Sequence, residues 1–249
     1  NFTELIPLLP EAGPRLAALQ GWTAREFARC RPALAARKAA GSVREGHGDL
    51  HLGNLALVDG RVTPFDCIEF NAELRWIDVA SELAFTYVDL LDHRRADLAA
   101  WLVHEWLQRT GDYSAGAVLR LYAVYRALVR AKVAALRGDA DEAGDYLAMA
   151  AGLAQPPPPG LVITHGLSAS GKTLATIRRL RADPAAATLA LHSDVERKRL
   201  HGLGPTAASG SGLATGIYSH EASRRTYDHL RQVAGELLAH VEALTVVAD

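Results

Sequence analysis

The sequence predicts a mixed α/β chain of two domains: a helix-rich first domain, then a domain with a parallel sheet and flanking helices. Apolar residues recur at helical spacing through much of residues 11–153. Consecutive prolines at 156–159 then end this pattern, because proline cannot continue a helix and favours a short, stiff segment. Short β-prone runs alternate with helical stretches after the prolines, as in parallel α/β folds. We therefore expect a first domain at residues 1–154, a linker at 155–160 and a second domain at 161–249.

The composition indicates a protein with an apolar core and almost no net charge. The 249 residues carry a formal net charge of −1, and 49% of them are hydrophobic. Because no basic excess is present, we expect neither a nucleic-acid partner nor binding to an anionic membrane. No apolar run reaches membrane-spanning length, and Cys30 and Cys67 have no metal-ligand spacing, so we expect reduced thiols in a cytoplasmic protein. The chain starts at Asn1 and stops at Asp249 after a β-prone run, which predicts a fragment truncated at both ends; these features leave the oligomeric state open.

The most specific motif opens the second domain. It is the run Gly166-Leu167-Ser168-Ala169-Ser170-Gly171-Lys172-Thr173, which fits the phosphate-binding P-loop, or Walker A, pattern. A β-prone run at 161–164 precedes it and a helical pattern follows, as this motif requires. Glycines let the backbone N–H groups turn toward phosphates, Lys172 reaches the β- and γ-phosphates, and the Thr173 hydroxyl is placed for Mg²⁺. We predict ATP and Mg²⁺ as cofactors; the alternative is a glycine- and serine-rich turn that matches by chance.

A second group of residues follows the β-prone run Thr188–Leu191. The segment Ser193-Asp194-Val195-Glu196-Arg197 resembles the Ser-Asp-x-x-Arg segment of gluconate-kinase-like and zeta-toxin-like P-loop kinases. This resemblance implies that Asp194 orients or deprotonates the acceptor hydroxyl and that Arg197 contacts phosphate or substrate. The alternative is that Ser193 or Asp194 merely caps an exposed, charged helix. The closing run 244–249 resembles a Walker B strand, which implies that Asp249 helps to hold Mg²⁺.

The first domain has its own set of polar residues, with the spacing His47-x-Asp49-x-x-x-x-Asn54. Asp59-Gly60 between short apolar runs predicts a hairpin, and Asp66 directly follows it. The run 47–55, with Phe65-Asp66 after a hairpin, resembles the C-terminal lobe of the aminoglycoside phosphotransferase and choline kinase group, which has a protein-kinase-like fold. The resemblance implies that Asp49 is a base and that Asn54 and Asp66 hold Mg²⁺. No part of residues 1–45 resembles the N-lobe, which supplies the glycine-rich loop and phosphate-pairing lysine in that group.

Two alternatives remain open in the first domain. His47 and His51 beside Asp49 could bind a metal, whereas in the group named above the first histidine is structural. Asp78 resembles the aspartate that supports the catalytic loop, although an acid in the first turn of a helix is equally consistent.

Helical spacing also predicts the helices themselves. They cover 11–19, 23–40 (with Thr23 as N-cap), 76–91, 95–109, 115–137 and 140–153, then 173–182, a stretch after Ser193 or Asp194, and 218–243. The glycine- and serine-rich residues 201–217 predict a loop near the acceptor site.

Together these features predict an ATP-dependent phosphotransferase, a bifunctional small-molecule kinase acting on a hydroxyl of a small acceptor. The order of the segments resembles bacterial fusions of an aminoglycoside phosphotransferase-like domain with a P-loop ATP-binding domain. The alternative is a non-catalytic kinase-like scaffold fused to a nucleotide-dependent P-loop switch. Phosphate transfer to a small acceptor distinguishes the kinase from the switch.

Overall fold

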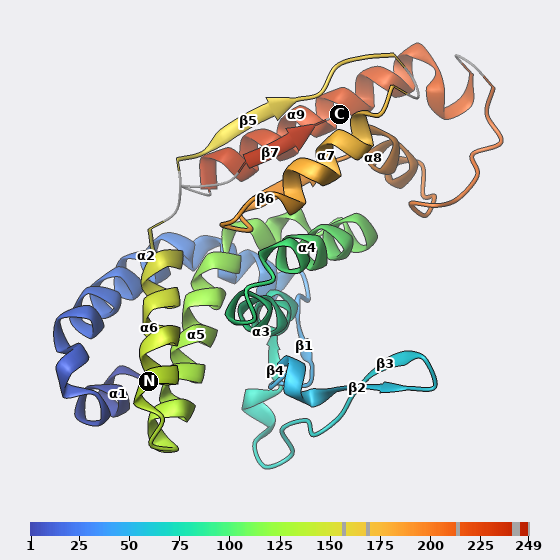
Figure 1. Ribbon diagram of the computed structural model, residues 1–249. Coiled ribbons are helices and arrows are strands. Elements are labelled where there is room, and N and C mark those ends of the chain that lie inside the picture. Colours follow the sequence, from blue (N-terminus) through green and yellow to red (C-terminus); the bar gives the residue numbers. More distant parts are fainter. Residues whose placement is uncertain (156–157, 168–169, 213–214, 241–244, 249) are drawn as a thin grey trace. The chain divides into compact units, whose positions relative to one another are not determined.

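The computed structural model describes residues 1–155, 158–167, 170–212, 215–240 and 245–248, the last stretch by its backbone alone (Figure 1).

The chain forms two compact units. The first unit comprises Asn1–Arg95 and Ala117–Pro156, and the second comprises Ala96–Gly116 and Pro157–Asp249. The second unit therefore includes a segment from the middle of the first predicted domain. The predicted linker at 155–160 is only one of the places where the chain passes from one unit to the other.

Helices form the framework of the first unit. They are α1 (Phe2–Leu8), α2 (Gly13–Ala39), α3 (Val79–Asp92), α5 (Leu119–Leu136) and α6 (Ala140–Leu153). Helices α5 and α6 pack against each other. The alanines Ala127, Ala131 and Ala134 of α5 are fully buried, and such small side chains allow neighbouring helices to approach closely.

Helix α2 differs from the prediction. Residues 11–19 and 23–40 were expected as separate helices with Thr23 as the N-cap of the second, but α2 runs unbroken through Gly21 and Thr23. A glycine inside a helix costs only about 1 kcal/mol relative to alanine. The buried residues Leu16, Leu19 and Cys30 on both sides of Gly21 compensate for that cost.

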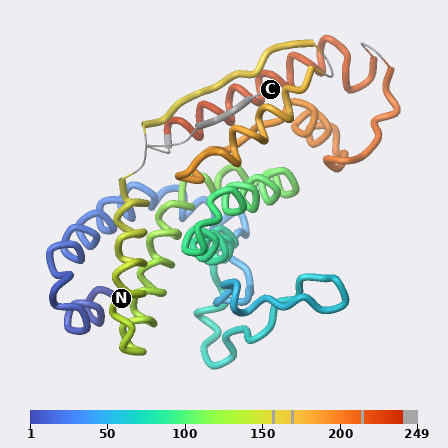
Figure 2. Tube along the Cα trace, viewed as in Figure 1, coloured from blue at the N-terminus to red at the C-terminus, as the bar shows by residue number. Residues whose placement is uncertain are grey.

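Short strands complete the first unit. Strand β1 (Val43–Glu45) pairs antiparallel with β4 (Trp76–Asp78), and β2 (Leu55–Val58) pairs antiparallel with β3 (Arg61–Pro64). The β2–β3 pair confirms the predicted hairpin, with positive φ at both turn residues. Figure 2 shows this hairpin, in cyan, extending away from the helices of its own unit.

The predicted helix at 76–91 begins later than expected. Its first residues form β4, and α3 starts at Val79 with Asp78 as its N-cap. The Asp78 backbone is extended, and its carboxylate accepts a hydrogen bond from the Ala80 amide at 2.9 Å. Apolar residues at 76 and 77 therefore continue the helical pattern in sequence but not in structure.

The second unit holds a parallel sheet. Strands β5 (Gly160–Ile163), β7 (Thr245–Ala248) and β6 (Thr188–Leu191) lie in this order, with Leu161 and Leu189 both paired with Val246. Its helices are α4 (Ala96–Thr110), α7 (Lys172–Arg181), α8 (Ser193–Leu200) and α9 (His220–His240). Both predicted strands near the P-loop are confirmed, and the expected closing strand is the middle strand of this sheet.

Helix α4 lies against α7 and β6 of the second unit. Its Val103 and Leu107 are buried, as are Leu180 of α7 and Leu191 of β6. Residues 96–116 thus belong to the same apolar core as the sheet. None of the helices that the structure describes combines the length and apolarity needed to cross a membrane.

Candidate functional site

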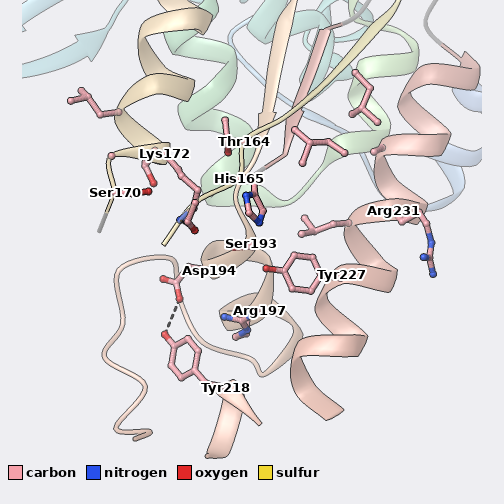
Figure 3. Close-up of a pocket in the computed structure, with 18 of the residues that line it drawn as sticks. Thr164, His165, Ser170, Lys172, Ser193, Asp194, Arg197, Tyr218, Tyr227 and Arg231 are labelled. Atoms are coloured by element: carbon pink, nitrogen blue, oxygen red, sulfur yellow. Dashed lines mark hydrogen bonds between the residues drawn. The ribbon is translucent and has the colours of Figure 1, made fainter. Parts of the chain in front are cut away.

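A cavity of about 1600 Å³ lies where β5 and β6 end (Figure 3). Residues after β5, the start of α8, the turn η5 (Gly216–Tyr218) and one side of α9 line it. In parallel α/β sheets, ligands bind at the carboxyl ends of the strands. The cavity is therefore where such a fold binds its ligands.

The P-loop forms one side of this cavity. Gly171 is the N-cap of α7 and has a φ of 85°, a left-handed conformation that favours glycine. Lys172 donates from Nζ to the carbonyls of Gly166 at 3.1 Å and Leu167 at 2.9 Å, so its charge lies over the loop. The Ser170 amide also donates to the Leu167 carbonyl at 3.2 Å.

Of five further residues predicted to bind nucleotide or metal, the structure describes two. Gly166 and Thr173 both line the cavity, with Thr173 in the first turn of α7. Ser168, Ala169 and Asp249 lie outside the described residues. The residues present fit ATP: a left-handed glycine at a helix start, a lysine over the loop and a hydroxyl beside it are the phosphate and Mg²⁺ groups of a P-loop.

Asp194 faces the P-loop residues across the cavity. Its Oδ1 accepts a hydrogen bond from the Tyr218 hydroxyl at 2.8 Å, and its Oδ2 lies 2.8 Å from Lys198 Nζ. Burial raises the pKa of Asp194, but hydrogen bonds from Lys198 and Tyr218 outweigh that effect, so the pKa lies below its usual value. The carboxylate is ionised at neutral pH.

The predicted cap of α8 is wrong. The N-cap is His192, one residue earlier, and it makes no capping bond through its side chain. Asp194 does not cap the helix because its carboxylate is bound to Tyr218 and Lys198. The Asp194 carboxylate therefore lines the cavity and does not stabilise the end of the helix.

Arg197 lies one turn after Asp194 and also lines the cavity. Only 9% of this residue is exposed, and its guanidinium carbon lies 4.9 Å from the centre of the Tyr218 ring. Within the described part of the chain, its buried Nε has no hydrogen-bond partner. A buried N–H group without such a partner is costly, so Arg197 is suited to bind an oxygen-rich group of a ligand.

Between these residues, Glu196 points away from the cavity into the core. It is fully buried and accepts hydrogen bonds from Tyr113 at 2.7 Å and from Arg199, with His229 Nε2 at 3.2 Å. These bonds tie α8 to α9 and to the segment 96–116. Helix α8 is therefore not the exposed, charged helix of the alternative prediction.

The roles of Tyr218 and Glu196 were not predicted from the sequence. Tyr218 is 24 residues from Asp194, across a glycine- and serine-rich segment, and Glu196 looks like one more charge in a charged helix. The helical spacing of Asp194 and Arg197 could have indicated which face of α8 meets the cavity, whereas no local signal pairs Tyr218 with Asp194.

In the first unit, the structure brings Asp49 and Asn54 together. Asn54 is buried, and its Nδ2 donates to the Asp49 carbonyl at 3.0 Å and to Asp49 Oδ2 at 3.2 Å. The Phe65 amide donates to the Asn54 carbonyl at 3.0 Å, which places the exposed Asp66 next in the chain to this contact. Asp66 has a φ of 59°.

The histidines nearby have structural partners. His47 Nε2 lies 2.7 Å from the Phe65 carbonyl, and His51 Nδ1 accepts from the Gly53 amide at 3.1 Å. His51 Nε2 is 3.5 Å from Asp49 Oδ2. Among the described residues, these three do not form a set of metal ligands; the group with suitable geometry is Asp89, Asp92 and His93.

One face of α3 holds the loop that carries Asp49. Glu82 accepts from the amides of His47, at 2.6 Å, and Gly48; Thr86 donates to the Leu50 carbonyl at 2.6 Å; and Asp89 accepts from the Leu52 amide at 2.7 Å. The three positions follow helical spacing, so one helix face anchors three points of the loop. These three residues were not predicted as a set, although polar residues at this spacing in an apolar helix are a usable signal.

Asp78 has a different role from the one that the resemblance implies. It forms a buried ion pair with Arg37 at 2.7 Å and accepts hydrogen bonds from Ala80 and, at 3.3 Å, from the Tyr122 hydroxyl. Its contacts are thus with α2, α5 and the start of α3.

Comparison with known proteins supports the assignment of the second unit. Residues 161–249 match a protein-family model described as an AAA domain, which agrees with a P-loop nucleotide-binding domain of the kinase or NTPase type. The comparisons give no evidence for the aminoglycoside phosphotransferase-like domain.

The matching curated proteins are uncharacterized proteins of Mycobacterium bovis and of the strains H37Rv and CDC 1551 of Mycobacterium tuberculosis. Each is 32% identical to this chain over 220 residues, which is 86% of the chain and 44% of the relative. The chain therefore spans less than half the length of these relatives. No solved structure matches it.

Proposed function

We propose that the second unit binds ATP with Mg²⁺ and transfers the γ-phosphate to a hydroxyl of a small acceptor. The observation that carries this proposal is the shared cavity: the P-loop after β5 and the carboxylate of Asp194 after β6 line the same space. A P-loop alone would fit many NTPases. A carboxylate that faces it across the cavity is what transfer to a hydroxyl requires.

The residues that line the cavity have separate roles in the proposed reaction. The acceptor hydroxyl donates its proton to the Asp194 carboxylate while its oxygen attacks the γ-phosphorus. The bond between that phosphorus and the bridging oxygen breaks, and ADP leaves with the electron pair. Lys172 and the amides at the start of α7 stabilise the phosphate charge, and Arg197 binds a transferring phosphate or an oxygen-rich group of the acceptor.

The metal requires oxygen ligands, which Thr173 and Asp249 supply in this proposal. Mg²⁺ would neutralise charge on the β- and γ-phosphates. The protein residues hold the acceptor in line with the γ-phosphate, and such positioning provides most of the rate.

Two substitutions test these roles by opposite results. Lys172→Ala should weaken ATP binding about tenfold or more, because it removes the main side-chain cation on the phosphates. Asp194→Asn should keep ATP affinity within a few-fold and lower transfer by about two orders of magnitude or more. Calorimetry measures the first quantity, and labelled ATP with a panel of sugars, amino-alcohols and nucleosides measures the second.

Contrary results would reassign the residues. Equal ATP affinity in Lys172→Ala would refute the P-loop site. If Asp194→Asn lost ATP binding but kept turnover at saturating ATP, Asp194 would be a nucleotide or metal ligand. Slow hydrolysis without any acceptor, together with a nucleotide-dependent change in partner affinity, would favour the P-loop switch.

We also propose a second phosphotransfer site in the first unit, with Asp49 as base and Asn54 and Asp66 as Mg²⁺ ligands. Its support is the contact of Asn54 with Asp49 and the anchoring of their loop by α3. In the kinase group that this segment resembles, a separate lobe supplies the lysine that pairs with the phosphates. We expect the site to need such a lobe.

A further inference from the structure

The Tyr218 hydroxyl lies at the oxygen of Asp194 where an acceptor would react. It donates to Oδ1 at 2.8 Å (Figure 3). A hydroxyl that gives its proton to a carboxylate must come within about 2.6–3.2 Å of one of its oxygens. The Tyr218 hydroxyl therefore already has the geometry that a reacting acceptor needs.

Tyr218 reaches Asp194 from inside the cavity. Tyr218 is one of the cavity-lining residues, whereas Lys198, which holds the other carboxylate oxygen, is not. Lys198 also donates to the Pro205 carbonyl at 3.2 Å, and its bond to Asp194 is between charged groups. Both bonds have an ionised acceptor, but only the Lys198 bond joins two opposite charges, so the Tyr218 bond is the weaker of the two and the one exposed to a ligand.

The backbone fixes Tyr218 at this place. Gly216 has a φ of 54°, and a Cβ there would lie 2.9 Å from Ser211 Cβ, so only glycine fits. Ile217 is buried, and its amide donates to Ser211 Oγ at 3.4 Å. Directly after Tyr218, Ser219 Oγ accepts from the Ala222 amide at 3.3 Å in the first turn of α9. The ring is therefore placed by a tight turn on one side and a helix start on the other.

We propose that Tyr218 occupies the place of the acceptor hydroxyl, so that an acceptor reacts only after displacing the Tyr218 hydroxyl from Oδ1 of Asp194. This inference rests on the function proposed above. Lys198 keeps Oδ2 and orients the carboxylate, while Oδ1 changes partner. The same displacement takes the Tyr218 ring away from the guanidinium of Arg197 and makes that cation accessible to a group next to the acceptor hydroxyl.

The displacement also limits reaction with water. In hydrolysis, water donates a proton to Asp194, its oxygen attacks the γ-phosphorus, and ADP and inorganic phosphate are released. Water gains little from replacing a phenol at Oδ1, because it forms few other contacts. Tyr218 therefore selects acceptors that bind the cavity at several points.

Water is consequently a suitable probe, since it requires no knowledge of the acceptor. The 249-residue chain is assayed with Mg²⁺ and ATP alone, and the hydrolysis that Lys172→Ala abolishes is taken as the signal. Tyr218→Phe should increase this hydrolysis about ten- to hundredfold, the equivalent of one hydrogen bond to a charged group. ATP affinity measured by calorimetry should stay within about twofold, and adding Asp194→Asn to Tyr218→Phe should remove the gain.

The pH profile reports on the bond between Tyr218 and Asp194 itself. Loss of the Tyr218 donor raises the pKa of Asp194, so the acidic limb of the hydrolysis profile should move to higher pH in Tyr218→Phe. Tyr125→Phe is the matched control, because Tyr125 lies in the first unit and is partly exposed. It should change neither the rate nor the profile.

Two results would overturn the inference while leaving the proposed function intact. One is unchanged or lower hydrolysis in Tyr218→Phe with normal ATP affinity, since Tyr218 would then be inert or would take part in the reaction itself. The other is a gain in Lys198→Gln that Tyr218→Phe does not show, which would make Oδ2 the reacting oxygen. Absence of ATP binding in the unaltered chain would instead refute the proposed function, and this inference with it.

Discussion

His104 shows how burial changes the chemistry of a single residue in the second unit. It is 3% exposed, and in the described part of the chain its Nδ1 has no hydrogen-bond partner. Its ring centre lies 5.3 Å from that of His192. Burial, and then the charge of His192, lower the pKa of His104 from 6.5 to about 4. The folded protein therefore holds this imidazole neutral.

The consequence is a loss of stability in mild acid. Because the pKa of His104 is lower in the folded protein than in the unfolded chain, the unfolded chain takes up the proton first as pH falls. The stability that the neutral imidazole contributes is complete above pH 6.5 and is lost as pH falls toward 4. We expect about 2 kcal/mol less stability from this residue at pH 5 than at pH 7.5. Urea unfolding at both values measures the difference, which should shrink in His104→Gln. The exposed His220→Gln is the control, and an equal pH dependence in both variants would contradict the assignment.

At the scale of elements, α4 shows why helical periodicity does not decide where a helix packs. The period identifies the apolar face of residues 96–110, but not the element that covers it. That partner is the sheet of the second unit, and Tyr113 after α4 bonds with Glu196, 83 residues away in the sequence. Contacts at such separation leave no local pattern in either segment.

Removing part of this contact should destabilise the second unit. Leu107 is 1% exposed, so Leu107→Ala should cost about 2–5 kcal/mol by lost burial and the cavity it leaves. Leu136→Ala on α5 is the matched control, because Leu136 is 64% exposed. Thermal unfolding with and without ATP measures the effect. A stable, ATP-binding fragment 157–249 would show instead that α4 is dispensable.

What the sequence predicts about the site depends on how local each feature is. The P-loop is contiguous, so its spacing predicts the strand, the glycine-rich turn and the helix, and the structure confirms the strand and the helix. Asp194 follows from a short segment after a strand. Tyr218 does not, because its bond to Asp194 spans a glycine-rich segment whose path no periodicity describes. The start of α3 was not predicted for a similar reason. Asp78 caps this helix by a local bond to the Ala80 amide, but it is also held by an ion pair with Arg37, which is distant in the sequence.

At the scale of the whole chain, we expect all phosphate transfer by these 249 residues to occur in the second unit. The first-unit site lacks a recognisable lysine for the phosphates in residues 1–45. Lys172→Ala should therefore abolish transfer, whereas Asp49→Asn should leave it unchanged within about twofold. Labelled ATP and the same acceptor panel test both. Transfer that survives Lys172→Ala and disappears on adding Asp49→Asn would show that the first site works without a further lobe.

The division of the chain also determines the order in which it can fold during synthesis. Residues 96–116 leave the ribosome before the strands of their unit, yet their core partners begin only after residue 157. At about 5–20 residues per second, the apolar face of α4 waits several seconds for the sheet. A holdase chaperone has that interval in which to bind it, and slowing translation after residue 116 should lengthen the exposure. Cleavage of the chain within prolines 156–159 would not release the whole second unit, because its residues 96–116 stay covalently joined to the first unit at both ends.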